Sequence, residues 1–444
     1  MKKVRNISIV GAGLVGSLLA IYLRKRGYNV SVFERRPDMR RSGVNAGRSI
    51  NLALSTRGIK ALEEVGLDAE IKKAAIPMHG RMVHNLNGAL VFQPYGKQGE
   101  FINSISRNAL NGVLMYEAER LGVEFFFEHR CVHVDYAHTI LELKHGSEKI
   151  MRPSDLIIGA DGAFSNVRMA MQMSDRFDYS QEYVEHSYKE FHIPPGAGGK
   201  FQLEQHALHI WPRQSFMFIA LPNPDGSFTG TLFFPLEGPQ SFASLKTDAD
   251  ITRFFEETFP DAHALMPALI KDFHDNPTSS LVTIKCYPWV QHNTLVIGDA
   301  AHAIVPFYGQ GMNAGFEDCR VLHHLLQEHS DDWDIVLPLF QQLRKPDADT
   351  ISRLAHENFV EMRDHVADVD FLLRKKIEGR LYERYPDRWI PLYPMVTFRD
   401  DIRYSEAYRI GQRQKEIMDE VMKRPDIRTA WESLDLEAIV GQLG

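Results

Sequence analysis

The sequence predicts a mixed α/β (α+β) protein, in which a parallel-sheet domain carries an inserted antiparallel sheet and is followed by a C-terminal helical lobe. Three observations support this fold class. Residues 6–35 alternate between apolar strand-like stretches, a glycine-rich turn and a helix-like stretch. Residues 181–284 contain stretches such as SFMFIAL, separated by Pro, Asn, Asp and Gly, as is typical of antiparallel strands. After about residue 331 the chain is highly charged and has helical periodicity.

The composition limits the class of protein and its partners. With 444 residues, of which 44% are hydrophobic and 25% charged, the chain is globular and too long for one small core. Its net charge of -7 offers no basic surface for nucleic acid or an anionic membrane. The three cysteines are scattered without a CxxC spacing, which argues against a disulfide framework or structural zinc and favours a cytoplasmic location. The composition leaves the oligomeric state open.

The first element is a βαβ unit. We predict a strand over residues 6–10, a turn over 11–16, a helix over 17–27 and a second strand over 29–35. The uncharged segment 7–23 follows a basic start, as in a signal peptide. It is short for a spanning helix, and its glycines fit a nucleotide-binding turn, so no membrane partner is expected.

The remaining elements follow the same reasoning. We predict a helix over 107–122 and strands over 123–129, 131–135, 155–162 and 294–302. One apolar helical stripe is predicted in the C-terminal lobe from Ile351, Leu354, Asn358, Met362, Val366, Val369 and Leu373. The predicted domains are a discontinuous nucleotide-binding domain (1–75, 98–180 and 285–330), a substrate-side sheet domain (76–97 and 181–284) and the helical lobe (331–444).

The turn GAGLVG carries the chemistry of a Rossmann-like dinucleotide site. Gly11 permits the tight turn, Gly13 lets the backbone approach a pyrophosphate, and Gly16 permits close packing of helix and strand. Glu34, at the end of the second strand, is placed to accept a hydrogen bond from a ribose hydroxyl. An acidic residue there favours FAD or NAD over NADP as the tightly bound ligand. Arg35 is a further candidate contact, with a solvated charge as its equal alternative.

A second glycine-rich stretch favours flavin. Gly298 and Asp299 end a predicted strand, where a carboxylate suits the ribityl hydroxyls of a flavin. PFYGQGMNAGFED follows, and its helix would direct the backbone N–H groups of Gly311, Met312 and Asn313 at the ring. A reduced isoalloxazine is anionic, and a helix N-terminus stabilises an anion by about 0.3–1 kcal/mol, or up to roughly 2 when partly buried.

These motifs, together with DGAFSNVR (residues 161–168), resemble the single-component aromatic hydroxylases of the p-hydroxybenzoate hydroxylase type. The resemblance covers about the first 330 residues. Further stretches are similar to the members of that family that hydroxylate L-kynurenine, and they include segments of the C-terminal lobe: GRSINLALSTRG, GRMVHNLNG, QPYG, NSISRNALN, ENFVEM and PLYPMVTF. The C-terminus lacks the hydrophobic membrane-associating tail of eukaryotic members, so the chain resembles the bacterial soluble form.

The resemblance implies roles for individual residues. It implies that Arg81 and Tyr95 hold the substrate carboxylate and that Asn358 and Tyr393 contact the substrate from the C-terminal lobe. Tyr308 is implied to lie over the substrate ring, with no certain catalytic residue. Implied FAD contacts are Ala53, Arg107, Val132, Asp299, Met312 and Asn313, which join the predicted contacts Gly11, Gly13, Val15, Gly16, Glu34, Arg35 and Gly311. His302 is interpreted as a packing residue rather than a general base, and no metal site is expected.

The resemblance also implies a reaction: hydroxylation of L-kynurenine to 3-hydroxykynurenine with dioxygen and transiently docked NADPH, through a flavin hydroperoxide on tightly bound FAD. Two alternatives remain open from the residues. One is the same fold acting on another phenol or anthranilate-like aromatic, and the other is a flavin-binding sensor without turnover. The sequence leaves open the pathway served, tryptophan catabolism or pyridine nucleotide biosynthesis, and the preference for NADPH over NADH.

Overall fold

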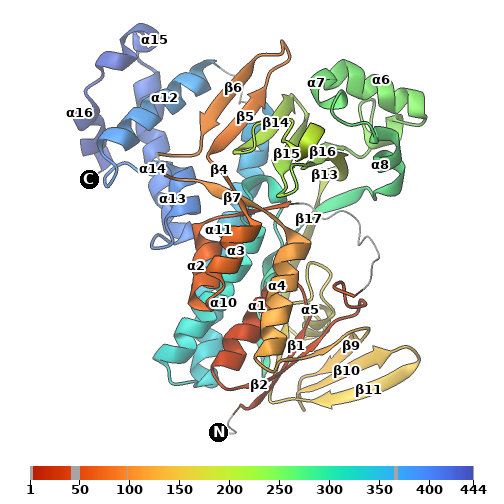
Figure 1. The fold of residues 1–444 in the computed structure, drawn as a ribbon. Coiled ribbons are helices and arrows are strands. Elements are labelled where there is room, and N and C mark those ends of the chain that lie inside the picture. The colour runs from red at the N-terminus through yellow and green to blue at the C-terminus, as the bar shows by residue number, and fades with distance from the viewer. Residues whose placement is uncertain (1–3, 42–50, 98, 365–368, 444) are drawn as a thin grey trace.

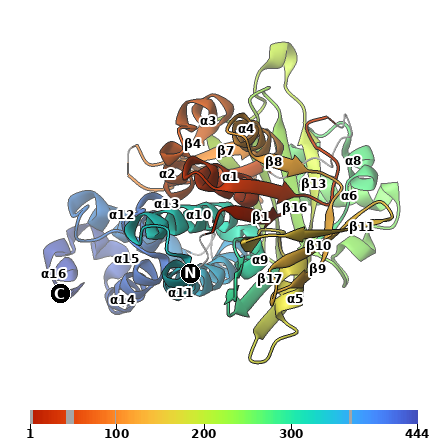
Figure 2. The same ribbon diagram turned by 90° about the horizontal axis from the view of Figure 1, so that it is seen from below.

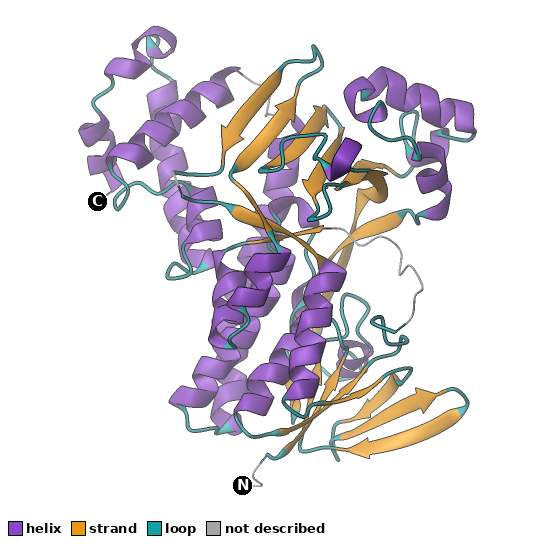
Figure 3. Ribbon diagram, viewed as in Figure 1, coloured by secondary structure: helices purple, strands orange, loops and turns teal. Residues whose placement is uncertain are grey.

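The computed structural model describes residues 4–41, 51–97, 99–364 and 369–443. Figure 1 shows a lower half built on the sheet that contains β1 and an upper half built on the sheet that contains β14. The C-terminal helices form a separate group beside the upper half, as the colouring by secondary structure in Figure 3 makes plain. The predicted combination of a parallel sheet, a second sheet and a helical lobe is confirmed.

The lower half contains the predicted nucleotide-binding sheet. Its six strands lie in the order β18-β19-β12-β1-β2-β8. All neighbouring pairs are parallel except β18 and β19. The strands are β1 (Asn6–Val10), β2 (Asn29–Phe33), β8 (Glu124–Phe126), β12 (Leu156–Gly159), β18 (Val290–Gln291) and β19 (Thr294–Val296).

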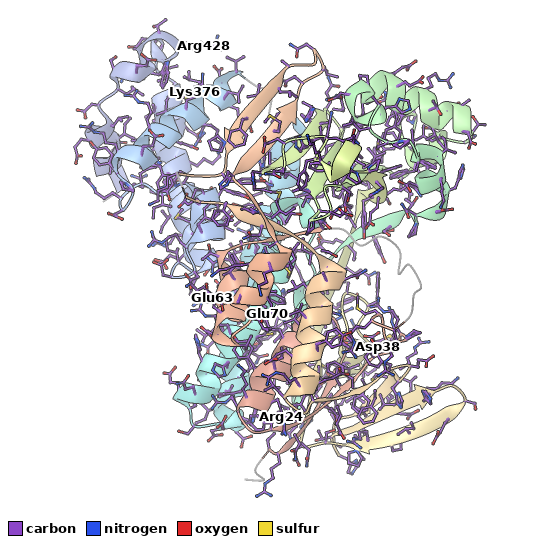
Figure 4. The ribbon with its side chains drawn as sticks, viewed as in Figure 1. Arg24, Asp38, Glu63, Glu70, Lys376 and Arg428 are labelled. Atoms are coloured by element: carbon purple, nitrogen blue, oxygen red, sulfur yellow. The ribbon has the colours of Figure 1, made fainter. Side chains whose placement is uncertain are left out.

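Helix α1 (Leu14–Lys25) packs against α4 (Arg107–Arg120) and α10 (Gly311–Glu328). The helix begins earlier than predicted because Gly13, whose backbone is extended, is already its N-cap. Arg24 at the end of α1, labelled in Figure 4, donates to the carbonyl of Leu121 at 2.9 Å and fastens α1 to the end of α4. Figure 2 shows α1 and α10 lying side by side.

The upper half contains a seven-stranded sheet in the order β17-β13-β16-β15-β14-β5-β6. All its pairs are antiparallel, as predicted, except β14 and β5, which are parallel. The exception arises because the hairpin of β5 and β6 comes from a distant part of the chain. The strands are β5 (Gly80–His84), β6 (Leu90–Pro94), β13 (Asp178–Ile193), β14 (Ala207–Arg213), β15 (Phe216–Pro222), β16 (Phe228–Pro235) and β17 (Ser279–Tyr287).

Smaller elements complete the two halves. One three-stranded sheet contains β9 (Arg130–Asp135), β10 (Ile140–His145) and β11 (Glu148–Pro153), and another contains β3 (Asn51–Leu54), β4 (Ile76–Met78) and β7 (Ile102–Ser106). Helices α2 (Thr56–Glu64) and α3 (Asp68–Ala74) precede β4, whereas α6 (Asp248–Thr258), α7 (Pro260–His263) and α8 (Leu269–Asp275) lie beside the upper sheet.

The C-terminal lobe is helical, as predicted, but its apolar stripe is not continuous. Its helices are α11 (Trp333–Asp364), α12 (Val369–Arg384), α13 (Leu392–Phe398), α14 (Tyr404–Met422), α15 (Ile427–Ala430) and α16 (Leu436–Val440). Ile351, Leu354 and Asn358 are buried on α11, whereas Val369 begins a new helix and is 68% exposed. The side chains of Met362 and Val366 lie outside the described residues, as do Gly47–Ile50 of the family-like stretch.

Candidate functional site

The first glycine turn joins β1 to α1 and allows two backbone segments to approach closely. Gly11 has φ +105°, and a Cβ there would lie 2.5 Å from the carbonyl oxygen of Ala160. A Cβ on Gly16 would lie 2.0 Å from the carbonyl oxygen of Gly11. Gly13 is different, because its Cβ would meet no heavy atom within 4 Å. Gly11 and Gly16 therefore serve the fold, and Gly13 leaves space at the N-terminus of α1, where a phosphate would lie.

The acidic residue of this motif lies beside the same turn. Glu34 accepts a hydrogen bond from the backbone N–H of Ala12 at 3.0 Å and another from Arg36 at 3.0 Å. Its carboxylate is thus held next to the turn and keeps further acceptor capacity. Arg35, in contrast, is exposed.

Val15 lies where three glycine-containing segments meet. A Cβ on Gly298 would lie 3.0 Å, and one on Gly315 2.6 Å, from Cγ2 of Val15. The side chain of Val15 therefore closes the gap between the start of α1, the end of the β19 strand and helix α10. Because the Val15 side chain packs inside the protein, only its backbone is left for the predicted cofactor contact.

The second glycine turn leads into the short helix α9 (Asp299–His302). Asp299 is exposed, and its side chain makes no hydrogen bond or ion pair within the described residues. His302 is buried, and its Nε2 lies 2.6 Å from Asp318 Oδ2. Asp318 also accepts from the N–H of Gly298 at 3.2 Å, and its other oxygen binds Arg344 at 2.7 Å. His302 is therefore a structural partner of Asp318, in agreement with its predicted packing role.

The stretch PFYGQGMNAGFED forms a 3-10 turn over Pro306–Tyr308, a left-handed residue at Gly309 (φ 69°) and helix α10 from Gly311. The predicted start of the helix is confirmed. The first N–H of this helix with a helical acceptor is that of Ala314, which donates to the carbonyl of Gln310 at 2.8 Å. The preceding N–H groups, those of Gly311, Met312 and Asn313, belong to the first turn, whose donors have no partner within a helix.

The side chain of Asn313 is occupied by the protein itself. Its Oδ1 accepts from the N–H of Ser55 at 2.9 Å, and its Nδ2 donates to the carbonyls of Ala53 and Gly309, both at 2.9 Å. The amide therefore ties β3 to the glycine loop, and Ala53 lies against that loop. Only the backbone of Asn313 is left to face a ligand.

Other predicted cofactor contacts lie farther along the same half of the molecule. Arg107 is exposed at the first position of α4, and Val132 on β9 is 40% exposed. Asp161 accepts from the Ser165 hydroxyl at 2.5 Å and from the N–H of Asn166 at 2.7 Å, and so caps helix α5 (Asn166–Met171). Burial raises the pKa of Asp161.

Two supporting residues were not singled out from the sequence. Arg168 is buried and donates to the carbonyls of Ala300 and Ala163, both at 2.7 Å, so it joins the Asp161 turn to α9. Asn111 on α4 donates to the carbonyl of Ala12 in the first glycine turn at 3.0 Å. Both lie within family-like stretches, but nothing in the spacing indicates which backbone carbonyl a side chain will reach.

These groups fit an elongated dinucleotide. Open space at Gly13 suits phosphates, the exposed carboxylate of Asp299 suits hydroxyl groups, and the N-terminal N–H groups of α10 suit an anionic ring. The residues therefore fit FAD from its pyrophosphate to its isoalloxazine.

The predicted substrate residues gather on the side of the upper sheet and the C-terminal lobe. Arg81 of β5 lies with its guanidinium carbon 5.6 Å from the Tyr95 ring centroid and 5.5 Å from that of Tyr393. The Tyr95 and Tyr393 rings are stacked at 5.5 Å, and Tyr393 is stacked on Tyr308 at 5.4 Å. Tyr393 therefore stands between Arg81 and the loop that leads into α10.

This cluster has unused hydrogen-bonding capacity. Within the described residues, the buried Arg81 Nε and the buried hydroxyl of Tyr95 have no hydrogen-bond partner. Burial raises the pKa of the Tyr95 hydroxyl, so it remains a donor at neutral pH. A guanidinium and a hydroxyl that both donate are suited to binding a carboxylate.

Two residues of α11 adjoin the cluster. Asn358, an implied substrate contact, donates to the carbonyl of Phe307 at 2.7 Å, so its amide nitrogen binds backbone. Burial raises the pKa of Tyr308, and the negative charge of Glu361 contributes to that rise, which places a carboxylate near the cluster. Glu361 lies in ENFVEM and was not predicted as a site residue.

In the part of the chain that the structure describes, no group of three His, Cys, Asp or Glu side chains could hold a metal ion. None of the described helices is both long and apolar enough to cross a membrane. Cys131, Cys286 and Cys319 are buried and unpaired.

Comparisons with known proteins agree with this geometry. The family described as "FAD binding domain" matches residues 4–222 and 244–334. Kynurenine 3-monooxygenase of Christiangramia forsetii is 50% identical over 98% of this chain and 98% of its own length. The enzyme of the same name from Myxococcus xanthus is 51% identical over 91% of this chain and 88% of its own length, and that from Dictyostelium discoideum is 45% identical over 95% and 94%.

Solved structures show the same fold at lower identity. The tetrameric form of 2-methyl-3-hydroxypyridine-5-carboxylic acid oxygenase has a TM-score of 0.69 and 20% identity, over 86% of this chain and 98% of that chain. Pseudomonas aeruginosa PqsL in complex with 2-aminobenzoylacetate has a TM-score of 0.66 and 20% identity, over 82% and 97%.

Proposed function

The chain belongs to the kynurenine 3-monooxygenase family, and from this membership we propose which of its residues serve each part of the reaction. It is a flavin-dependent monooxygenase that hydroxylates L-kynurenine. The bound FAD supplies the two-electron chemistry with a nicotinamide and dioxygen, and the protein supplies binding, orientation and a dry cavity. The observation that carries the assignment of roles is the pair of buried donors, Arg81 Nε and the Tyr95 hydroxyl, which have no hydrogen-bond partner within the described residues. The guanidinium carbon of Arg81 lies 5.6 Å from the Tyr95 ring centroid.

Arg81 and Tyr95 bind the carboxylate of the amino acid. Tyr393, stacked between Tyr95 and Tyr308, sets the distance from that carboxylate to the ring that reacts. Tyr308 lies over the substrate ring. The aniline nitrogen of kynurenine activates the ring carbon beside it, so the reaction requires no protein acid or base, and none of these side chains is assigned one.

The lower half would hold FAD. Gly13 and the N-terminus of α1 would face its pyrophosphate, Glu34 its ribose, and Asp299 its ribityl chain. The backbone N–H groups of Gly311, Met312 and Asn313 would stabilise negative charge on its ring. Further contacts come from Ala53, Arg107 and Val132, with Arg35 beside the adenosine end, and Gly11, Val15 and Gly16 form the turn.

NADPH is the proposed reductant, and it docks only transiently, because the sequence contains one GxGxxG turn. The domain boundaries predicted from the sequence are proposed as the division of labour: flavin binding below, substrate capture above and in the C-terminal lobe. A cytoplasmic location is proposed on the basis of three unpaired, buried cysteines.

The experiment that tests this proposal uses the purified, FAD-loaded protein with L-kynurenine, NADPH and isotopically labelled dioxygen. We expect a product that has gained one labelled oxygen on the aromatic ring, detected by mass spectrometry. A panel of phenols and anthranilate-like aromatics separates the kynurenine assignment from a same-fold relative. Faster NADPH oxidation and labelled product with a panel compound, but not with kynurenine, would refute the substrate assignment, and no ligand-dependent NADPH oxidation at all would favour the flavin sensor.

A further inference from the structure

A buried arginine lies at the boundary between the flavin-facing helix and the substrate-facing lobe. Arg57, near the start of α2, is 1% exposed. Helix α2 contacts both α10 and α13, so this side chain can reach both (Figure 1). Neither the family-like stretches nor the proposed reaction assigns it a role.

One side of the Arg57 guanidinium binds the end of α13 and the loop that follows. Its Nε donates to the carbonyl of Val396 at 2.8 Å, and its Nη2 donates to the carbonyls of Arg399, at 2.9 Å, and Ile402. The last carbonyls of a helix have no partner within the helix, so an arginine that donates hydrogen bonds to them stabilises the end of the helix at that position. Helix α13 also carries Tyr393, one turn before Val396.

The other side of the guanidinium binds α10. Nη1 of Arg57 lies 2.5 Å from Glu317 Oε1. The guanidinium also lies over the ring of Tyr404, 4.1 Å from its centroid, and the Tyr404 hydroxyl donates to the side chain of Gln310 at 3.1 Å. Gln310 is the N-cap of α10. Arg57 is therefore connected both to the beginning of the flavin-facing helix and to a carboxylate two turns inside it.

The acidic pair on α10 extends this connection toward α9. Glu317 Oε2 lies 2.8 Å from Arg344, and Arg344 binds Asp318 at 2.7 Å. Asp318 holds His302 and the N–H of Gly298, next to the predicted ribityl contact. One buried network thus joins the end of α13 to the glycine turn at Gly298 and to the start of α10 at Gln310.

We propose that Arg57 is a positioning residue, which holds Tyr393 at a fixed distance from the flavin-facing loop so that a kynurenine bound by Arg81 presents its ring correctly. The inference rests on the proposed function, because it concerns the spacing of the same two ligands. Lysine cannot replace arginine here, since its single ammonium cannot serve three carbonyls and a carboxylate that lie on opposite sides. Loss of the guanidinium contacts would let α13 shift, and a misplacement of the substrate ring by about 1 Å costs on the order of 10²-fold in rate.

The test compares wild-type holoenzyme with Arg57→Lys. We expect FAD to be retained and the KM for kynurenine to change little, because Arg81 and Tyr95 are intact. The kcat for hydroxylation should fall about 10- to 100-fold. For each NADPH oxidised, less hydroxylated product and more hydrogen peroxide should form. The change in the visible spectrum of bound FAD during titration with kynurenine should be smaller than in the wild type while its midpoint is preserved.

Arg213→Lys is the matched control. Arg213 is also a buried arginine that binds backbone carbonyls, those of Thr258 at 2.7 Å and His84 at 3.1 Å, but it lies in the upper sheet. We expect a lower melting temperature and a normal ratio of product to NADPH. If both variants lose only melting temperature, Arg57 is merely structural and the proposal is overturned.

Two further outcomes are decisive. If Arg57→Lys does not fold, Tyr404→Phe removes only the hydrogen bond to Gln310, and it should lower the product ratio in the same direction by a smaller factor. An unchanged ratio in that variant overturns the proposal. If the wild type binds FAD and kynurenine but forms no hydroxylated product, the proposed function fails. Spectral titration of the wild type and of Arg57→Lys with kynurenine then still decides whether Arg57 positions the ligand.

Discussion

The flavin site and the substrate site are built from different parts of the polypeptide. The flavin site is largely backbone: glycine turns at strand ends and the N-termini of α1 and α10, with the Asn313 side chain spent on holding the loop. The proposed substrate site consists of side chains that three distant segments bring together: Arg81, Tyr95, Tyr308 and Tyr393. Substitutions at the glycines of the first site that pack against backbone, Gly11 and Gly16, should therefore change fold and cofactor binding together, whereas substitutions at the second site should change substrate binding alone.

The largest effect is expected where a glycine of the flavin site supports the fold. In Gly11→Ala the new methyl group would lie 2.5 Å from the Ala160 carbonyl at φ +105°. Strain of about 1–3 kcal/mol and overpacking of about 1–3 kcal/mol should lower the free energy of unfolding by roughly 2–6 kcal/mol. Denaturant unfolding of the apoprotein measures this loss, and FAD retention should fall with it. An apoprotein as stable as the wild type would show that the turn can open without cost.

The second-largest effect, weaker kynurenine binding, is expected at the proposed substrate site. Arg81→Met removes the guanidinium from a buried position but keeps an apolar chain, so it should weaken kynurenine binding by about 2–5 kcal/mol. FAD content should be unchanged. Arg353→Met is the control, because Arg353 is exposed and also lies over a tyrosine, 5.2 Å from the Tyr408 ring centroid. Spectral titration with kynurenine measures both variants, and wild-type affinity in Arg81→Met would remove this residue from the site.

The same division explains how much the sequence could predict. The glycine turns were found from local spacing, because a backbone site is encoded within a few consecutive residues, and the start of α10 at Gly311 was predicted correctly. The cluster around Arg81 was reached only through family resemblance, since no pattern in the chain indicates that β5 and α13 will meet. The roles of Arg57, Arg168 and Asn111 were missed because buried side chains find backbone carbonyls far away in sequence. The prediction of one continuous apolar stripe in the C-terminal lobe was wrong, because periodicity in the sequence does not show where one helix ends and another begins.

A smaller effect separates cofactor binding from folding within the flavin turn. Gly13 has an ordinary extended backbone, and a Cβ there meets nothing within 4 Å. Gly13→Ala should leave the apoprotein as stable as the wild type and lower FAD affinity by about 1–3 kcal/mol, the cost of crowding a well-packed ligand. Fluorescence titration of apoprotein with FAD measures the affinity. A loss of apoprotein stability equal to that of Gly11→Ala would mean that Gly13, too, serves the fold.

The smallest expected effect is a loss of folding stability at low pH, and it arises in the upper sheet rather than in the flavin-binding half. Burial lowers the pKa of His209 to about 4. Its Nδ1 lies 2.9 Å from His84 Nε2, and the other ring nitrogen of His84, Nδ1, lies 2.7 Å from Asp261 Oδ2. The pKa of Asp261 is lowered to about 2: burial opposes this shift, and the bonds from His84 and Trp211 outweigh it, so this carboxylate stays ionised throughout mild acid.

Between pH 6.5, the ordinary pKa of histidine, and about 4, the unfolded chain binds a proton at His209 that the folded chain does not. Stability is therefore lost as pH falls, by about 1 kcal/mol between pH 7 and pH 5.5 from this residue. His209→Gln should lower stability at pH 7 but remove this part of the slope, whereas the exposed control His356→Gln should keep it. Denaturant unfolding followed by tryptophan fluorescence suits the measurement, because Trp211 stacks on His84 at 3.9 Å and reports on this sheet. An identical slope in wild type and His209→Gln would place the acid sensitivity elsewhere and leave the two halves alike in this respect.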